Sequence, residues 1–152
     1  MEAAKELAKT ELFEGLPPED LAAFASVARA VRFAPDMKVY DPGASGDALY
    51  VIVEGSFSVQ VKDEHGDEVE VARLKAGNYF GEMEVIGGIG RTAAVVSMQD
   101  GRCYVFDAAA LMALLKDKSH LAAHFYQRVA RELVRRLKNT TRDMGFFKAR
   151  AT

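Results

Sequence analysis

The segment YFGEMEVIGGIGRTAAVVS, residues 79–97, interrupts an apolar run with three glycines within four positions, a lone arginine and two carboxylates. A short helix that begins at a glycine directs free backbone N–H groups and the positive end of its dipole toward an anion. Gly81 allows the backbone to approach a ligand closely, and the glycines at 87, 88 and 90 permit a reversal that brings Arg91 back toward the same point. Because an arginine pairs with phosphate through two parallel N–H donors, we expect this segment to hold a small phosphate.

Glu82 in the same segment needs a different role. A carboxylate repels a neighbouring anion, whereas a carboxylate that faces a sugar hydroxyl is a strong acceptor. Gly81, Glu82 and Arg91 together therefore indicate a compactly held ribose phosphate. Two simpler interpretations stay open: an exposed hairpin position for Arg91, and a helix-start role for Glu82, where acids are favoured.

The periodicity of the chain changes twice. A helical pattern gives way to short Val-rich strands at intervals of about ten residues, which are typical of an antiparallel barrel or sandwich, and then returns. We therefore predict a single domain over residues 1–152. Its expected parts are N-terminal helices over 1–30, the strands over 31–107, C-terminal helices over 108–143 and a tail over 144–152.

Local signals refine these zones. Pro17 and Pro18 can open a helix whose apolar face extends to Ala28, and Asp107 is a plausible N-cap. Turn clusters are expected at 41–47 and 62–68. The last helix carries an apolar stripe at every fourth residue, which consists of Leu121, Phe125, Val129, Leu133 and Leu137.

The bulk composition is that of an ordinary globular domain. The chain has 152 residues, a net charge of −2 and 49% hydrophobic residues, so it has no general attraction for nucleic acid or acidic membranes. It lacks an apolar signal core and any run approaching the roughly 20 apolar residues of a membrane span. Its only cysteine, Cys103, is expected to be a small buried residue. We expect a soluble, cytoplasmic domain that binds no membrane.

Catalytic and metal-binding patterns are weak. No Ser–His–acid or Cys–His arrangement is legible, so we expect no enzyme. His120 and His124 lie four residues apart on a helix and could reach one metal ion, but no third ligand is apparent nearby. The stretch 128–142 holds six basic residues and one acid, which favours a solvated helix face, and we expect no direct nucleic-acid binding. No metal and no cofactor are predicted.

Residues 80–95, FGEMEVIGGIGRTAAV, resemble the phosphate-binding cassette of cyclic nucleotide-binding domains. These domains occur in bacterial catabolite-activator-type regulators, in regulatory subunits of cyclic-nucleotide-dependent kinases and in nucleotide-gated channels. The similarity covers about residues 11–142 and includes the Gly43 to Asp47 turn and Glu54-Gly55, where two strands meet. It implies an α+β fold, an antiparallel β-roll or jelly-roll barrel (double-stranded β-helix) flanked by helices at both ends.

The resemblance also implies roles for residues of the cassette. Arg91 would pair with the cyclic phosphate, and Glu82 would accept a hydrogen bond from the ribose 2′-hydroxyl. Backbone N–H groups at the start of the cassette helix would come from Gly81, Met83 and Glu84.

Other parts of the expected site follow from the same resemblance. Thr92 and Ala93 would complete the phosphate cradle, and Val71 would pack against the ribose and base. A threonine at position 92 also hints at tolerance of cGMP. The candidates for a lid over the base, on the last helix, are Leu133, Arg136 and Leu137.

Glu84 departs from the family pattern, which has a small residue at this position. If its carboxylate points into the cradle, it repels a ligand phosphate; if it points into water, screening removes most of that cost. Gly90 stands where the family often has proline, so the loop before Arg91 is expected to be less rigid.

Two functions from different classes follow. The first is a sensor domain that binds cAMP or cGMP and transmits occupancy through the C-terminal helix. The alternative keeps the fold without the ligand, as a structural or protein-interaction module whose pocket Glu84 closes. The expected partners are the nucleotide and either a second copy bound through the C-terminal helix or an effector domain outside this chain.

Overall fold

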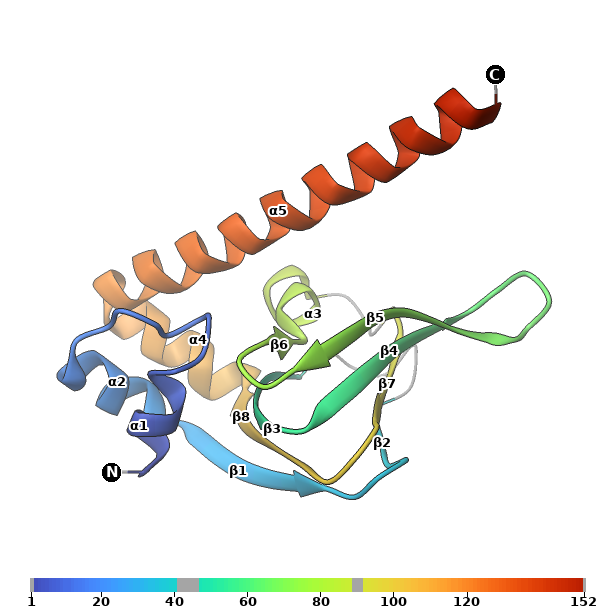
Figure 1. The fold of residues 1–152 in the computed structure, drawn as a ribbon. Helices are drawn as coiled ribbons and strands as arrows, with labels where there is room; N and C mark the ends of the chain where they lie inside the picture. The colour runs from blue at the N-terminus through green and yellow to red at the C-terminus, as the bar shows by residue number, and fades with distance from the viewer. Residues whose placement is uncertain (1, 41–46, 89–91, 152) are drawn as a thin grey trace.

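Two antiparallel β-sheets flanked by helices make up the fold. The computed structural model describes residues 2–40, 47–88 and 92–151, with side chains described as far as residue 142. Within these residues the strands form two four-stranded sheets, ordered β1-β8-β3-β6 and β2-β7-β4-β5 (Figure 1). This arrangement confirms the predicted α+β class with an antiparallel jelly-roll barrel and helices at both ends.

The eight strands divide equally between the two sheets of the described structure. The first sheet contains β1 (Ala28–Phe33), β3 (Ala48–Glu54), β6 (Tyr79–Phe80) and β8 (Gly101–Asp107). The second sheet contains β2 (Lys38–Tyr40), β4 (Ser56–Lys62), β5 (Glu68–Lys75) and β7 (Ala94–Ser97). The helices are α1 (Glu2–Leu7), α2 (Pro18–Ala25), α3 (Glu82–Gly87), α4 (Ala108–Asp117) and α5 (Ser119–Ala151).

Both faces of β8, an inner strand of the first sheet, are buried. Alternate residues of a strand point to opposite faces, and in β8 this places Cys103 and Val105 in the cluster that includes Phe57 of the second sheet. Tyr104 and Phe106, between and beyond them, pack instead in the cluster formed with the helices. Cys103 is fully buried as expected, and burial raises the pKa of its thiol to about 12.

The N-terminal boundary differs slightly from the expectation. The helix opened by Pro17 and Pro18 ends at Ala25, and Ala28 is the first residue of β1, where it pairs with Phe106. Ladder pairing with β8 therefore outweighs the helical pattern at Ala28. The predicted turn at 41–47 lies outside the described residues except for Asp47.

The C-terminal helices begin where the sequence predicts, and the last one is longer than predicted. Asp107 is the N-cap of α4 as expected, although its carboxylate accepts a hydrogen bond from Arg29 at 3.2 Å rather than from the helix. Helix α5 continues to Ala151, through residues that the sequence pattern assigned to a tail.

The apolar stripe of α5 divides into two parts. Leu121, Phe125 and Val129 are buried against the helix-side core, whereas Leu133 is 36% and Leu137 is 67% exposed. In this part of α5 the side chains that line the pocket beside α3 are Arg135, Arg136, Asn139 and Thr140, and Leu133 and Leu137 are not among them. The helix then runs on beyond the body of the domain (Figure 1). The second half of the stripe therefore does not cover the barrel.

Candidate functional site

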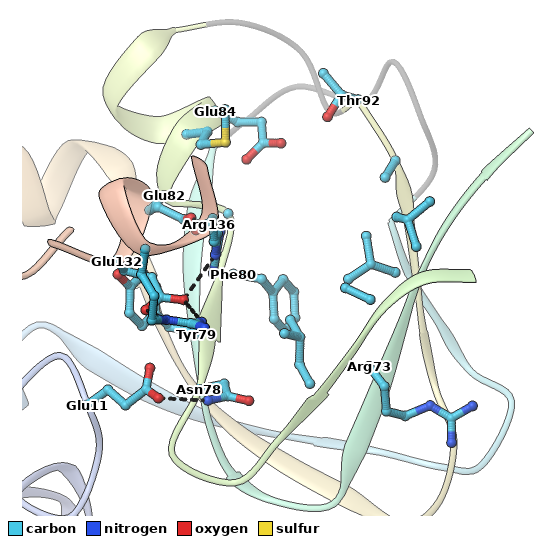
Figure 2. A pocket seen from close by; sticks show the side chains of 18 of the residues that line it. Glu11, Arg73, Asn78, Tyr79, Phe80, Glu82, Glu84, Thr92, Glu132 and Arg136 are labelled. Carbon is cyan, nitrogen blue, oxygen red and sulfur yellow. Dashed lines mark hydrogen bonds and ion pairs between the residues drawn. The ribbon is translucent and has the colours of Figure 1, made fainter. Parts of the chain in front are cut away.

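A pocket of about 610 Å³ lies where α3, β6, the second sheet and α5 meet. Figure 2 shows side chains of residues that line it. The described residues that line it are Glu11, Tyr40, Val59, Val71, Ala72, Arg73, Leu74, Asn78, Tyr79, Phe80, Gly81, Glu82, Met83, Glu84, Thr92, Ala93, Glu132, Arg135, Arg136, Asn139 and Thr140.

The backbone at Gly81 sets the geometry of the cassette. Gly81 is the N-cap of α3 with φ +93°, a left-handed conformation that residues with a Cβ rarely adopt. The strand just before it is fixed by Phe80, whose ring stacks on Tyr50 with centroids 4.8 Å apart. The turn at Gly81 thus converts β6 directly into the short helix that the sequence predicts at the cassette.

Glu82 is buried and paired with α5. Glu82 is only 3% exposed. The Arg136 guanidinium donates a hydrogen bond from Nη1 to Glu82 Oε1 at 2.9 Å. Burial raises the pKa of the Glu82 carboxyl, while the positive charge of Arg136 acts in the opposite direction. Arg136 also donates from Nε to Glu132 Oε1 at 3.1 Å. Sequence reasoning placed Arg136 only as a candidate lid over the base and missed this ion pair.

Glu84 lies in the pocket and not in open solvent. The residue is 9% exposed and lines the pocket, and Figure 2 shows its carboxylate directed into the pocket. Of the two orientations that the sequence left open, the structure has the inward one.

The remaining candidates divide between the pocket and its surroundings. Thr92, Ala93, Val71 and Met83 line the pocket, although Met83 is 52% and Val71 is 58% exposed. Among the lid candidates Arg136 lines it, whereas Leu133 and Leu137 are not among the described residues that do. Arg91 lies outside the described residues.

Tyr79 was not foreseen as part of the site. It is 2% exposed, and within the described part of the chain its hydroxyl has no hydrogen-bond partner. Burial chiefly raises the pKa of this phenol, so the hydroxyl stays protonated. No local sequence signal reports such a hydroxyl, because its surroundings come from strands and helices far apart in the chain.

Replacing Tyr79 with phenylalanine is expected to leave the free energy of unfolding unchanged or to raise it by up to about 1 kcal/mol. A buried hydroxyl without a hydrogen bond lowers the stability of the folded state, and the substitution removes this hydroxyl. Tyr104→Phe is the matched control, because the Tyr104 hydroxyl donates to Glu6 Oε1 at 2.7 Å. This control should lower the free energy of unfolding by about 1.5 kcal/mol or more. Urea denaturation of both variants measures the difference, and a loss of more than about 1 kcal/mol in Tyr79→Phe would show that this hydroxyl is well satisfied.

The histidines of α5 have separate partners. His120 Nε2 lies 3.0 Å from Asp20 Oδ1, and His124 Nε2 lies 2.9 Å from the Leu12 carbonyl oxygen. Across residues 2–40, 47–88 and 92–142, no three His, Cys, Asp or Glu side chains gather in a way that could hold a metal ion. Within the same ranges, no helix has the length and apolar character needed to cross a membrane.

Comparisons with known proteins agree with this fold. A profile of the family described as "Cyclic nucleotide-binding domain" matches residues 30–118, which is more than half of the chain. The "CRP-like cAMP-activated global transcriptional regulator" of Mycobacterium tuberculosis is 26% identical over 140 residues, which cover 92% of this chain and 62% of that protein. "Cyclic GMP-binding protein C" of Dictyostelium discoideum is 36% identical over 101 residues, which cover 66% of this chain and 4% of that protein.

A solved structure carries the same fold over most of the chain. The Thermus thermophilus catabolite activator protein superposes with a TM-score of 0.81 at 24% identity, covering 91% of this chain and 63% of that one. The chain thus spans less than two thirds of the length of these curated relatives. With the family profile matching across most of the barrel and α4, this chain belongs to the cyclic nucleotide-binding domain family.

Proposed function

We propose that this domain is a regulatory sensor that binds cAMP or cGMP in the pocket between α3, the second sheet and α5. The observation that carries the proposal is the convergence of the cassette residues on one pocket: Gly81 opens α3, and Glu82, Glu84, Thr92 and Ala93 line the same space. In this proposal Arg91 pairs with the cyclic phosphate, and Glu82 accepts a hydrogen bond from the ribose 2′-hydroxyl. Val71 packs against the ribose and base.

Helix α5 is the element that we propose transmits occupancy. Arg135, Arg136 and Asn139 bring it into contact with the pocket, so a change inside the pocket alters what α5 touches. The mycobacterial relative is named as a cAMP-activated regulator, which supports a role in signal transduction in the cytoplasm.

A second copy of the chain is the partner that we propose for α5. Its outward residues Tyr126, Leu133, Val134 and Leu137 are 36–67% exposed although they are apolar. An exposed apolar stripe of this kind is stabilised by pairing with another helix. An effector domain outside this chain is the alternative partner.

The burial of Glu84 favours a second candidate function. A carboxylate that occupies the cradle opposes a phosphate, which supports a domain that keeps the fold and serves as a structural or protein-interaction module. The two candidates differ in whether any cyclic nucleotide stabilises the domain.

Arg91→Ala is expected to weaken cyclic-nucleotide binding by about tenfold or more, because it removes charge-assisted hydrogen bonds to the phosphate. In a thermal unfolding experiment, ligand at about 100 times its dissociation constant should stabilise the wild-type domain by about 2.7 kcal/mol. At the same nucleotide concentration, Arg91→Ala should lose half or more of that stabilisation. Arg32→Ala, which removes an exposed arginine of β1, should keep it. Equal stabilisation of Arg91→Ala and wild type would rule out the phosphate role.

A further inference from the structure

We infer that this domain has a second ligand site, which binds a phosphate group in a cleft between α5, β6 and the segment that precedes α2. The cleft has a volume of about 290 Å³, and the described residues that line it are Glu11, Tyr79, Arg128, Arg131, Glu132 and Arg135. No described residue of α3 is among them, so the cleft lies beside the proposed nucleotide pocket and not within its cassette. The inference therefore does not depend on whether that pocket binds a cyclic nucleotide.

Three arginines of α5 supply the positive charge of the cleft. Arg128, Arg131 and Arg135 are three and four residues apart, so successive turns of the helix carry them on one side. Arg128 is also fixed in place, because its Nη1 donates to the Glu11 carbonyl oxygen at 3.0 Å and its Nη2 to the Glu14 carbonyl oxygen at 2.6 Å. Both acceptors are neutral, so these contacts position the Arg128 guanidinium without compensating its charge.

The acidic residues of the cleft leave much of this charge available. Glu132 accepts hydrogen bonds from two arginines of its own helix. Arg131 makes no hydrogen bond and no ion pair within the part of the chain that the structure describes. The Glu11 carboxylate accepts from the neutral Asn78 amide at 3.1 Å and not from an arginine. An anion in the cleft therefore meets two uncompensated guanidinium groups and one opposing carboxylate.

The Tyr79 hydroxyl is a buried donor beside these arginines. Tyr79 lines the cleft as well as the larger pocket, and Figure 2 shows it with Glu11 and Glu132 on the same side of that pocket. The residue is 2% exposed, and its hydroxyl has no partner within the described residues. An unpaired buried hydroxyl costs stability, and an acceptor oxygen on a ligand would remove that cost. The hydroxyl therefore points to a ligand that supplies such an oxygen.

These donors fit a phosphate group better than a carboxylate. Arg128 and Arg131 approach from two turns of α5 and Tyr79 approaches from β6, and a phosphate presents more than the two oxygens of a carboxylate to donors from different directions. A guanidinium pairs with phosphate through two parallel N–H donors. The cleft has about ten times the roughly 30 Å³ that one water molecule occupies in the liquid, so it has room for a small phosphate monoester as well as for inorganic phosphate.

The test is calorimetric titration of the full chain with inorganic phosphate and with glycerol 3-phosphate, at an ionic strength held constant with sodium chloride. We expect saturable binding of one phosphate group per chain for at least one of these compounds, and the tighter of the two tells free phosphate from a monoester. Arg131→Met and Tyr79→Phe should each weaken this binding by about tenfold, because each removes a hydrogen bond to a charged group. Both variants should fold, because neither side chain makes a hydrogen bond within the described residues.

Two control variants locate the bound phosphate. Arg142→Met removes the same charge from an exposed position of α5 that is outside both sets of described lining residues, and it should keep the wild-type affinity. Arg91→Ala alters the cassette and should also keep it. Arg131→Lys restores the positive charge and should recover part of the affinity that Arg131→Met loses.

Four results would overturn the inference or a stated part of it. Wild type that binds neither compound, or equal affinity in wild type, Arg131→Met and Tyr79→Phe, would show that the cleft holds no phosphate. Binding that is lost in Arg91→Ala and kept in Arg131→Met would place the phosphate in the cassette instead. Weakening in Arg131→Met alone would remove the Tyr79 hydroxyl from the site, and tighter binding of citrate than of both phosphate compounds would overturn the choice of phosphate over carboxylate. Titration with cAMP and cGMP tests the proposed nucleotide function separately, so the failure of one is distinguishable from the failure of the other.

Discussion

Replacing Glu84 with alanine is expected to tighten cyclic-nucleotide binding by about two orders of magnitude. Glu84 is 9% exposed and lines the pocket that would hold the phosphate. Two unit charges about 5 Å apart repel by roughly 3 kcal/mol at an effective dielectric of about 20, which corresponds to roughly 100-fold in affinity. Because the carboxylate is buried, salt screens this repulsion much less than it would at the surface.

Titration calorimetry of matched variants measures this effect. Glu84→Gln keeps the size of the side chain and removes its charge, so it should recover most of the gain. Glu19→Ala removes an exposed carboxylate of α2 and should leave the affinity unchanged. If Glu84→Ala and wild type have the same dissociation constant, the charge of Glu84 does not act on the ligand.

Replacing Gly55 with alanine is expected to lower the free energy of unfolding by about 3 kcal/mol or more. This figure combines the cost of a strained backbone conformation with the cost of overpacking. Gly55 lies between β3 and β4 with φ +90°, a conformation that alanine adopts only at a cost. A Cβ at this position would also lie 2.8 Å from the Gly101 Cα and 2.9 Å from the Asp100 carbonyl oxygen. Both neighbours are backbone atoms, so the strands must shift to accommodate the methyl group.

Gly66→Ala is the matched control for the steric part of this effect. Gly66 has a similar φ of +84°, but no atom lies within 4 Å of its added Cβ. Its replacement should therefore cost only the conformational part, about 1–2 kcal/mol. Denaturant unfolding of both variants separates the steric cost from the conformational cost. Equal decreases in the free energy of unfolding would show that the close approach of β8 to Gly55 is unimportant.

The fold could be predicted because its signals are local. The change from helical to strand periodicity, the N-cap at Asp107 and the glycine-opened helix at Gly81 each depend on a few consecutive residues. The cassette is similarly compact, so its resemblance to the family's phosphate-binding segment placed Gly81, Glu82 and Thr92 in one expected site. Their common place in the pocket agrees with that expectation.

The contacts that α5 makes could not be predicted in the same way. Glu82 and Arg136 are 54 residues apart, and nothing in either local sequence specifies that they meet. The stripe from Leu121 to Leu137 has one periodicity throughout, yet only its first half is buried, because further along the helix polar residues of 135–140 line the pocket instead. The direction of the Glu84 side chain also depends on tertiary packing, which residue type does not report.

Calorimetric titration of the wild-type domain with cAMP and with cGMP tests nucleotide binding most directly. We expect a saturable heat with one nucleotide site per chain for at least one of the two ligands, and a weaker interaction in Arg91→Ala. No heat with either nucleotide at millimolar concentration would contradict the sensor function and favour the ligand-free interaction module.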